Sequence, residues 1–336
     1  MGIGRGGADA QQHCRARAPP QGPACEEACF RLPWRAAEDN GVSRERMGYL
    51  FVAIAAVLWG LLGPVTQIAL REGMDAVEVA IWRALLGASL FAVHAVAIRK
   101  VRLDRRNLPS VAAFGVVGVA GLLGCYSRAV ATGGAALAAI LLYTSPVWVA
   151  LLSVLFLGER MTRRKLVALA VATLGVAGIA ASSGGGGIRL TPAALGWGLA
   201  SGFAYALYYL FGKRYFARYA TPTLFIYALP VGALAMLPLA QFSHKTPTAW
   251  AALAFMGLVP TYLAYVFYSA GLRRVEATRA ATVATVEPVV AAIAAYLMWG
   301  ERLSPAGYAC AAVVLEGVLL MVTGEVEKPL TEPPHA

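Results

Sequence analysis

The chain has 336 residues, of which 59% are hydrophobic and only 14% are charged. About a quarter of the residues of a soluble protein are charged, so the low share here indicates that much of the surface faces lipid. The net charge is +11, but the Lys and Arg residues lie in short clusters between long apolar segments. No basic face with interleaved aromatic residues is present, which argues against a nucleic-acid partner.

The N-terminal tail, residues 1–46, is rich in Arg, Ala, Gly and Pro and has no apolar run long enough for a secretory signal. It is predicted to be a disordered extension, with Met47 as an alternative start of the protein. Three cysteines, Cys14, Cys25 and Cys29, lie in this tail without a second ligand pair at zinc-site spacing. The sequence therefore predicts no metal site and no cofactor.

Ten predominantly apolar segments follow, each close to the roughly 20 residues that a helix needs to cross a bilayer. They cover residues 49–70, 76–98, 109–130, 134–156, 164–183, 192–212, 222–242, 249–271, 277–299 and 304–323. The predicted fold is all-α, a polytopic integral membrane protein of ten transmembrane helices. Several segments contain a proline: Pro64, Pro146, Pro230, Pro260 and Pro288. Such breaks are tolerated where neighbouring helices or water satisfy the freed backbone groups.

Positive charge alternates between the loops of this predicted bundle. The loops after the even-numbered spans hold fourteen Lys and Arg residues, against five in the loops on the other side. Cytoplasmic loops carry an excess of positive charge. Both termini are therefore predicted to be cytoplasmic, in the inner (plasma) membrane of the cell.

The sequence matches itself when it is shifted by 142 residues without gaps. Residues 157–162 (Leu-Gly-Glu-Arg-Met-Thr) then lie on 299–304 (Trp-Gly-Glu-Arg-Leu-Ser), and residues 145–147 (Ser-Pro-Val) lie on 287–289 (Glu-Pro-Val). Chance similarity between Ala- and Val-rich helices does not readily produce both matches at the same spacing. The sequence therefore contains an internal repeat.

Each repeat contains five predicted spans. The first covers residues 47–183 and the second 192–324, with a Gly-rich linker at 184–191 and a cytoplasmic tail at 325–336. Because five is an odd number, the two repeats are predicted to be inverted relative to each other. Inverted repeats that meet near the bilayer midplane are an architecture of transporters.

These motifs carry a resemblance to a known family. With Gly158-Glu159-Arg160 and Gly300-Glu301-Arg302 at equivalent places, Glu287-Pro288-Val289 in the second half and Trp59-Gly60 in the first span, the chain resembles the drug/metabolite transporter (DMT) superfamily, specifically the ten-span EamA type. The resemblance covers residues 47–324 and implies export or exchange of metabolites such as amino acids, nucleosides or toxic analogues. Arg128 departs from it, because family members more often carry an apolar residue near this point.

Glu287 is the first candidate site residue. It lies near the middle of the predicted ninth span, where a carboxylate costs about 2.5–3.5 kcal/mol or more on an isolated helix. Two interpretations stay open. Glu287 either exchanges protons or binds a cation during transport, or it is a buried hydrogen-bond anchor that fixes the helix beside Pro288.

Arg83 lies within the predicted second span and could bind a substrate carboxylate through two parallel hydrogen bonds. Alternatively, it pairs with a carboxylate such as Glu78 or extends to the membrane interface. His94, near the cytoplasmic end of the same span, is interpreted as an interfacial residue rather than a proton relay.

Tyrosines gather on one face of the sixth span and one face of the eighth. They are Tyr205, Tyr208 and Tyr209, and Tyr262, Tyr265 and Tyr268. A buried Tyr hydroxyl needs a hydrogen-bond partner, which a water-lined cavity supplies. Trp59, Tyr143, Tyr208 and Tyr265 are predicted to line a cavity for a flat or partly apolar metabolite. Tyr126 and Trp148 could join them, whereas tyrosines near span ends could form an aromatic belt.

Two further motifs are interpreted as structural. Glu159 and Glu301 are each expected to pair with a neighbouring Arg or to cap the following helix, for which Thr162 and Ser304 are good N-cap residues. The glycine run at 184–187 lacks the Gly-Lys-Ser/Thr ending of a phosphate-binding loop. It is interpreted as a linker, which leaves no case for an ATP-driven pump.

The sequence thus predicts a secondary transporter that exports small metabolites by alternating access between the two repeats. Its predicted partners are the lipid bilayer and a small-molecule substrate, with coupling to protons or exchange, and a homodimer is left open. An integral-membrane enzyme would need a catalytic set such as paired His, His-Glu-x-x-His or paired Asp within a span. No such set is present, so the protein is predicted not to be an enzyme. A non-transporting sensor or anchor should carry a soluble effector domain, for which the C-terminal tail is too short.

Overall fold

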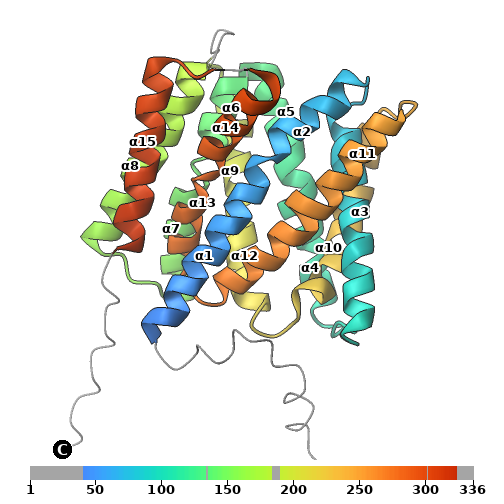
Figure 1. Cartoon of the computed structure of the whole chain (residues 1–336). Helices are drawn as coiled ribbons and strands as arrows, with labels where there is room; N and C mark the ends of the chain where they lie inside the picture. The colour runs from blue at the N-terminus through green and yellow to red at the C-terminus, as the bar shows by residue number, and fades with distance from the viewer. Residues whose placement is uncertain (1–40, 134, 184–189, 301, 324–336) are drawn as a thin grey trace, which may run out of the picture. The chain divides into compact units, whose positions relative to one another are not determined.

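The computed structural model describes residues 41–133, 135–183, 190–300 and 302–323. The predicted N-terminal extension up to residue 40, positions 184–189 of the predicted linker, Glu301 and the tail from residue 324 lie outside the described residues. From Glu45 onward the chain forms one compact unit. Its described residues form helices joined by short loops (Figure 1).

Ten helical rods make up this unit, several of them broken into shorter helices. In the first repeat they are α1 (Gly41–Gly60) with α2 (Leu62–Arg71); α3 (Ala76–Ala97); α4 (Leu108–Phe114), the π-helical segment η2 (Gly115–Gly121) and α5 (Leu122–Gly133); α6 (Ala135–Leu142) with α7 (Ser145–Leu157); and α8 (Arg163–Ser183). In the second repeat they are α9 (Pro192–Tyr215); α10 (Thr221–Met236) with the 3-10 turn η3 (Leu237–Leu239); α11 (Pro247–Met256), the π-helical segment η4 (Gly257–Leu263) and α12 (Ala264–Leu272); α13 (Ala277–Ala284) with α14 (Glu287–Trp299); and α15 (Pro305–Val322).

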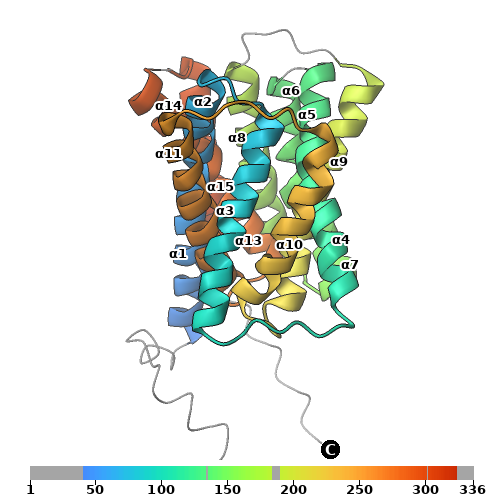
Figure 2. The same cartoon turned by 90° about the vertical axis from the view of Figure 1, so that its right-hand side faces the viewer.

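Successive rods run in opposite directions (Figure 2). We call the end that holds Glu45 of α1 and Val322 of α15 the lower end, as drawn in Figure 1, and the end where α2 stops and α3 starts the upper end. Because Glu45 and Val322 lie at the same end, an even number of rods separates them. The first rod begins at Gly41 rather than at the predicted residue 49.

Nine of the ten rods among the described residues are long and apolar enough to cross a membrane. The tenth, α9, has 24 residues, which is about 36 Å of helix at 1.5 Å per residue. Its hydropathy is lower because it carries four tyrosines and many small residues, and several of these side chains are buried against other helices. The predicted all-α fold with ten transmembrane helices is confirmed, and α9 is its least apolar member.

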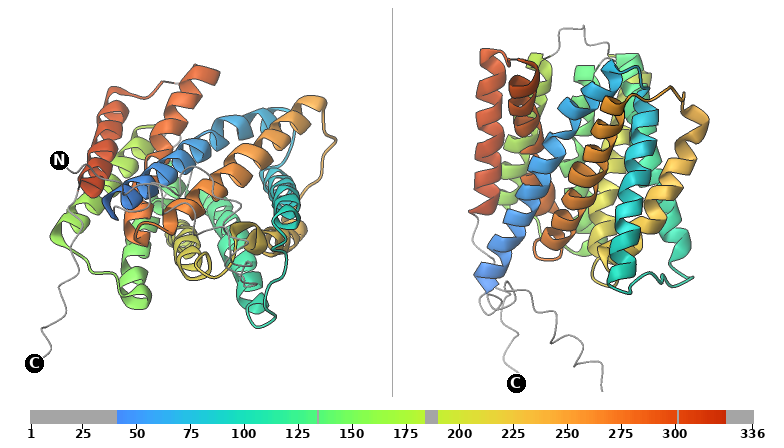
Figure 3. Two further views of the ribbon diagram at one scale, coloured as in Figure 1. Left: turned by 60° about the horizontal axis from the view of Figure 1, so that its bottom comes forward. Right: turned by 45° about the vertical axis from the view of Figure 1, so that its right-hand side comes forward.

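The helices repeat with the same 142-residue offset as the sequence. The two π-helical segments η2 and η4 begin and end at equivalent positions, as do α7 and α14. Gly158 and Gly300, which end these two helices, share a left-handed backbone with φ of 68° and 70°. In that conformation a side chain with a Cβ atom is strained. Because α1 rises from the lower end and α9 descends from the upper end (Figure 3), the two repeats are inverted.

Proline explains the breaks in two equivalent rods. Pro146 and Pro288 stand in the first turn of α7 and α14, directly after the turns that separate these helices from α6 and α13. Proline has no N–H to continue the preceding helix and fits well at a new helix start. Pro260 lies inside η4, whereas Pro230 lies inside α10 without ending it.

At the lower end, Glu159 does not have the predicted partner. Its carboxylate accepts hydrogen bonds from Ala277 N (2.6 Å) and from Thr278 N (3.2 Å) and Oγ1 (2.7 Å). Glu159 therefore caps the N-terminus of α13 in the other repeat. It does not form the predicted pair with a neighbouring Arg among the described residues, nor does it cap the following helix α8. The predicted N-caps are confirmed, since Thr162 accepts a hydrogen bond from Lys165 N and Ser304 accepts one from Gly307 N.

Candidate functional site

A cavity of about 1190 Å³ lies between the two repeats. This is larger than most small-molecule pockets, which hold about 300–1,000 Å³. Of its lining residues, Tyr209 of α9 and Tyr268 of α12 lie nearest the lower ends of their rods, and the lining extends to Ala76, Arg302 and Leu303 at the upper ends of the helices. The cavity therefore extends toward the upper end, and the lower ends of the rods close it.

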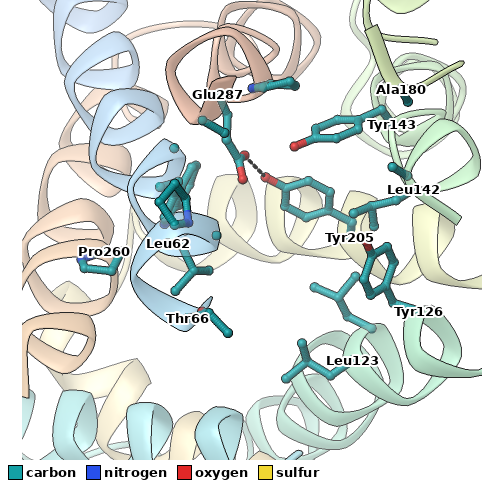
Figure 4. A pocket seen from close by; sticks show the side chains of 18 of the residues that line it. Leu62, Thr66, Leu123, Tyr126, Leu142, Tyr143, Ala180, Tyr205, Pro260 and Glu287 are labelled. Atoms are coloured by element: carbon teal, nitrogen blue, oxygen red, sulfur yellow. Dashed lines mark hydrogen bonds between the residues drawn. The ribbon is translucent and has the colours of Figure 1, made fainter. Parts of the chain in front are cut away.

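Glu287 faces this cavity as the first residue of α14, near the middle of the rod that α13 and α14 form. The hydroxyl of Tyr205 donates a hydrogen bond to its Oε2 atom at 3.2 Å, and the hydroxyl of Tyr143 points toward the same carboxylate (Figure 4). The break before α14 places this carboxylate at a helix N-terminus, where the helix dipole favours a negative charge. The helix break and two tyrosines thus accommodate a carboxylate inside the membrane.

Arg83 of α3 faces the cavity from the first repeat. Its Nε atom is buried without a hydrogen-bond partner, and no carboxylate in the described part of the chain lies within ion-pair distance of it. Its charge nevertheless reaches the carboxylate of Glu287. The inner part of the cavity therefore brings together the basic side chain of Arg83 and the acidic side chain of Glu287, from opposite repeats and not in direct contact, whereas a second basic residue, the exposed Arg302, lines it at the upper end.

The predicted alternative of a pair between Arg83 and Glu78 is wrong. Residues five apart on a helix point in directions about 140° apart, unlike residues three or four apart. Glu78 instead forms an ion pair with Lys245 Nζ at 2.5 Å and accepts hydrogen bonds from Ser243 N and Oγ. The sequence could not show this, because the loop that carries Lys245 belongs to the other repeat.

Aromatic rings form the floor of the cavity. The rings of Tyr208 and Tyr265 stack with centroids 5.9 Å apart, and Trp59 packs against Tyr265 at 5.7 Å and Tyr268 at 5.3 Å. Such pairs stabilise beyond the burial of their area. This floor is a rigid apolar surface against which a flat or apolar part of a ligand can pack.

All six predicted site residues line the cavity: Trp59, Arg83, Tyr143, Tyr208, Tyr265 and Glu287. Tyr126 joins them, whereas two other aromatic residues do not. Trp148 packs against Phe203 with centroids 5.5 Å apart, and Tyr262 makes a 2.9 Å hydrogen bond with His94 Nδ1.

Tyr205 and Gln67 are polar lining residues that were not among the six predicted site residues. Tyr205 belongs to the predicted tyrosine face of the sixth span, but its bond to Glu287 depends on how α9 packs against α14. Gln67 also lines the cavity, from α2. The sequence signal for Gln67 was a polar amide inside an apolar span, because such a group needs polar neighbours and so indicates a polar cavity or contact.

The cavity, the paired helix breaks and the inverted repeats agree with the comparison with known proteins. The model of the EamA-like transporter family matches residues 46–181 and 192–323. The chain belongs to the EamA-like transporter family. It is a multi-pass membrane protein of a transporter family and not an enzyme.

Relatives of this EamA-like transporter match along most of its length. An uncharacterized transporter of Archaeoglobus fulgidus is 31% identical over 82% of this chain and 96% of that protein. A probable terminal-alkyne amino-acid exporter of Streptantibioticus cattleyicolor is 28% identical over 80% of this chain and 91% of that protein. The uncharacterized inner membrane transporter YicL of Salmonella typhimurium is 26% identical over 82% and 95%.

A solved structure, described only as the crystal structure of a protein, has the same fold. It matches with a TM-score of 0.72 and 18% identity, over 81% of this chain and 95% of that one. At this identity the likeness supports the fold of the EamA-like transporter and no particular substrate.

Proposed function

We propose that this EamA-like transporter is a secondary transporter that exports a small metabolite with a carboxylate and an amine, an amino acid or a close relative of one. Alternating access between the inverted repeats carries the substrate across the membrane. The observation that supports this most is the placement of Arg83 and Glu287 on opposite repeats, facing one cavity.

Arg83 receives the carboxylate of the substrate. A guanidinium matches a carboxylate with two parallel N–H donors, and here its buried Nε has no hydrogen-bond partner among the described residues. Arg83 is partly buried, and a buried polar atom without a hydrogen-bond partner is costly. A bound carboxylate would relieve that cost, which favours an anionic group at this end of the substrate.

Glu287, with the hydroxyls of Tyr143 and Tyr205, receives the amine. A carboxylate inside the membrane that faces a cavity is suited either to bind a cation or to exchange a proton. We propose that it does both in turn, so that a proton replaces the amine after the substrate has left. In the alternative interpretation Glu287 only anchors α14, and its carboxylate need not change its charge during transport.

The aromatic floor supports the choice of substrate. Tyr208 and Tyr265 offer a stacked surface in the cavity that Arg83 also lines, and this surface is suited to an apolar side chain. The name of the Streptantibioticus cattleyicolor relative, which refers to an amino acid with an apolar alkyne tail, fits the same combination.

The proposed orientation of the protein in the membrane rests on the loop charges. With fourteen Lys and Arg residues in the loops of one side against five on the other, we propose that both termini are cytoplasmic, in the plasma membrane. The cavity then faces the outside. Fusion of a reporter that is active only in the cytoplasm to the C-terminus tests this, and an inactive reporter would reverse the orientation.

The substrate is tested in two steps. A thermal-shift screen of amino acids, their amine and carboxylate analogues, and nucleosides first identifies a ligand of the purified protein. The protein in liposomes is then assayed for flux of that ligand with and without a pH gradient. We expect an amino acid to stabilise the protein and to cross the membrane. Stabilisation by nucleosides alone would contradict the proposed substrate class, and the mass of the purified protein decides between a monomer and a homodimer.

A further inference from the structure

The closed lower end is held by polar contacts between the two repeats. The carboxylate of Glu159, which follows α7 of the first repeat, accepts three hydrogen bonds from Ala277 and Thr278 at the start of α13 in the second repeat. The Thr278 side chain is fully buried. This helix cap is strong, because a charged carboxylate forms stronger hydrogen bonds than a neutral acceptor and the dipole at a helix N-terminus favours a negative charge.

Two ion pairs next to this cap also join the repeats. Arg279 Nη1 contacts Glu45 Oε1 and the Tyr49 hydroxyl of α1, each at 2.7 Å. Glu276 Oε2 contacts Lys165 Nζ of α8 at 2.6 Å. In the pair of Arg279 with Glu45 the side chains are 10% and 17% exposed, so water and salt screen it little. In the other pair Lys165 is 7% exposed but Glu276 is 37% exposed, so this pair is screened more. We call these residues, with Glu159 and Thr278, the lower latch.

The lower latch is connected to the candidate site through one short helix. Thr278 and Arg279 lie in the first turn of α13, which ends at Ala284. A two-residue turn follows, and the next residue is Glu287. A movement of the lower end of α13 away from Glu159 would therefore also move the helix junction that places Glu287 in the cavity.

We propose that Glu159 is a positioning residue of transport: it holds α13 against the first repeat while the cavity is open toward the upper end, and its three bonds break when the lower end opens. This inference rests on the proposed transport function. It adds that the hydrogen bonds between Glu159 and α13 must be replaced by bonds to water in each transport cycle.

The test measures opening of the lower end directly and requires no substrate. Ala281 lies one turn above Thr278 on α13 and is 2% exposed. In a background without the five native cysteines, Ala281→Cys reports opening through its rate of reaction with a small water-soluble maleimide in lipid nanodiscs. We expect Glu159→Gln to raise this rate about tenfold, since a helix cap and charged hydrogen bonds are lost.

Two threonines on α13 provide a matched pair of variants. Thr278→Val removes the hydroxyl that bonds to Glu159, and we expect a rate increase of about three- to tenfold. Thr282→Val removes an equally buried hydroxyl whose bond within the described part of the chain is to the Thr278 carbonyl of its own helix, and we expect no change. Thr278→Val also serves if Glu159→Gln does not fold.

The two outcomes are distinct. A faster reaction in the Glu159 and Thr278 variants but not in Thr282→Val supports the proposal. Equal rates in the wild type and in Thr278→Val, or an equal increase in both threonine variants, overturn it. A protein that shows the expected labelling but transports no amino acid would contradict the proposed substrate while leaving the latch supported.

Discussion

Replacement of Arg83 by Gln is the sharpest test of the proposed site. The variant keeps a polar side chain of similar length but removes the charge and the two-pronged geometry that fit a carboxylate. Arg83 forms no ion pair with the described residues of the protein. Its removal should therefore affect the ligand much more than the fold.

The expected loss follows from the bonds that disappear. Hydrogen bonds to charged groups contribute about 1.5–3 kcal/mol each, and a neutral Gln retains at most one ordinary bond of about 0.5–1.5 kcal/mol. The net loss is about 3 kcal/mol, which corresponds to about a hundredfold weaker binding of an amino acid. The melting temperature should stay unchanged or rise, because the substitution removes a partly buried cation that forms no ion pair with the described residues.

The assay compares an amino acid with the amine that lacks only its carboxylate, by titration calorimetry on the purified protein. Arg83→Gln should weaken binding of the amino acid about a hundredfold and leave binding of the amine unchanged. Arg302→Gln is the matched control, because Arg302 also lines the cavity but is exposed at its rim, and exposed charges are screened. Equal effects of Arg83→Gln on both ligands would refute the role of Arg83.

Three further predictions concern the candidate site and the packing around it. Glu287→Gln should abolish the dependence of flux on a pH gradient, and a variant that retains this dependence in liposomes would make Glu287 a structural anchor. Glu78→Gln leaves Lys245 without its buried partner and should lower the free energy of unfolding by about 3–5 kcal/mol, seen as a lower melting temperature; an unchanged value would contradict the ion pair. A Cβ at Gly60 would lie 2.7 Å from Val290 Cβ and 2.9 Å from the Glu287 carbonyl oxygen, so Gly60→Ala should cost about 1–3 kcal/mol. Gly63→Ala, where nothing lies within 4 Å, should cost nothing, and equal melting temperatures would contradict this contact.

The fold was predictable from sequence because the membrane imposes simple rules on it. Apolar length defines the spans, and the ungapped match at 142 residues predicts paired elements that the structure contains. The helix start at Gly41 was missed, because residues 41–46 include three charged side chains and do not look like part of a span. Glu45 within that stretch nevertheless forms an ion pair with Arg279.

The candidate site was predictable in part. Arg83 and Glu287 stand out because charged residues inside apolar spans are rare and costly. Their placement in one cavity, the bond from Tyr205 to Glu287 and the cap that Glu159 provides for α13 join residues 82 or more positions apart. Such contacts depend on how the repeats pack, which periodicity along one helix does not contain.

The central claim is that the cavity between the inverted repeats is the path of the substrate. Ala292 lines this cavity on α14, away from the lower latch. In a cysteine-free protein, Ala292→Cys should transport the amino acid identified by the screen, and bound substrate should slow its reaction with a bulky maleimide. The most direct measurement is flux in liposomes after that reaction is complete. We predict that transport is abolished, and undiminished transport with a fully labelled cysteine would contradict the account.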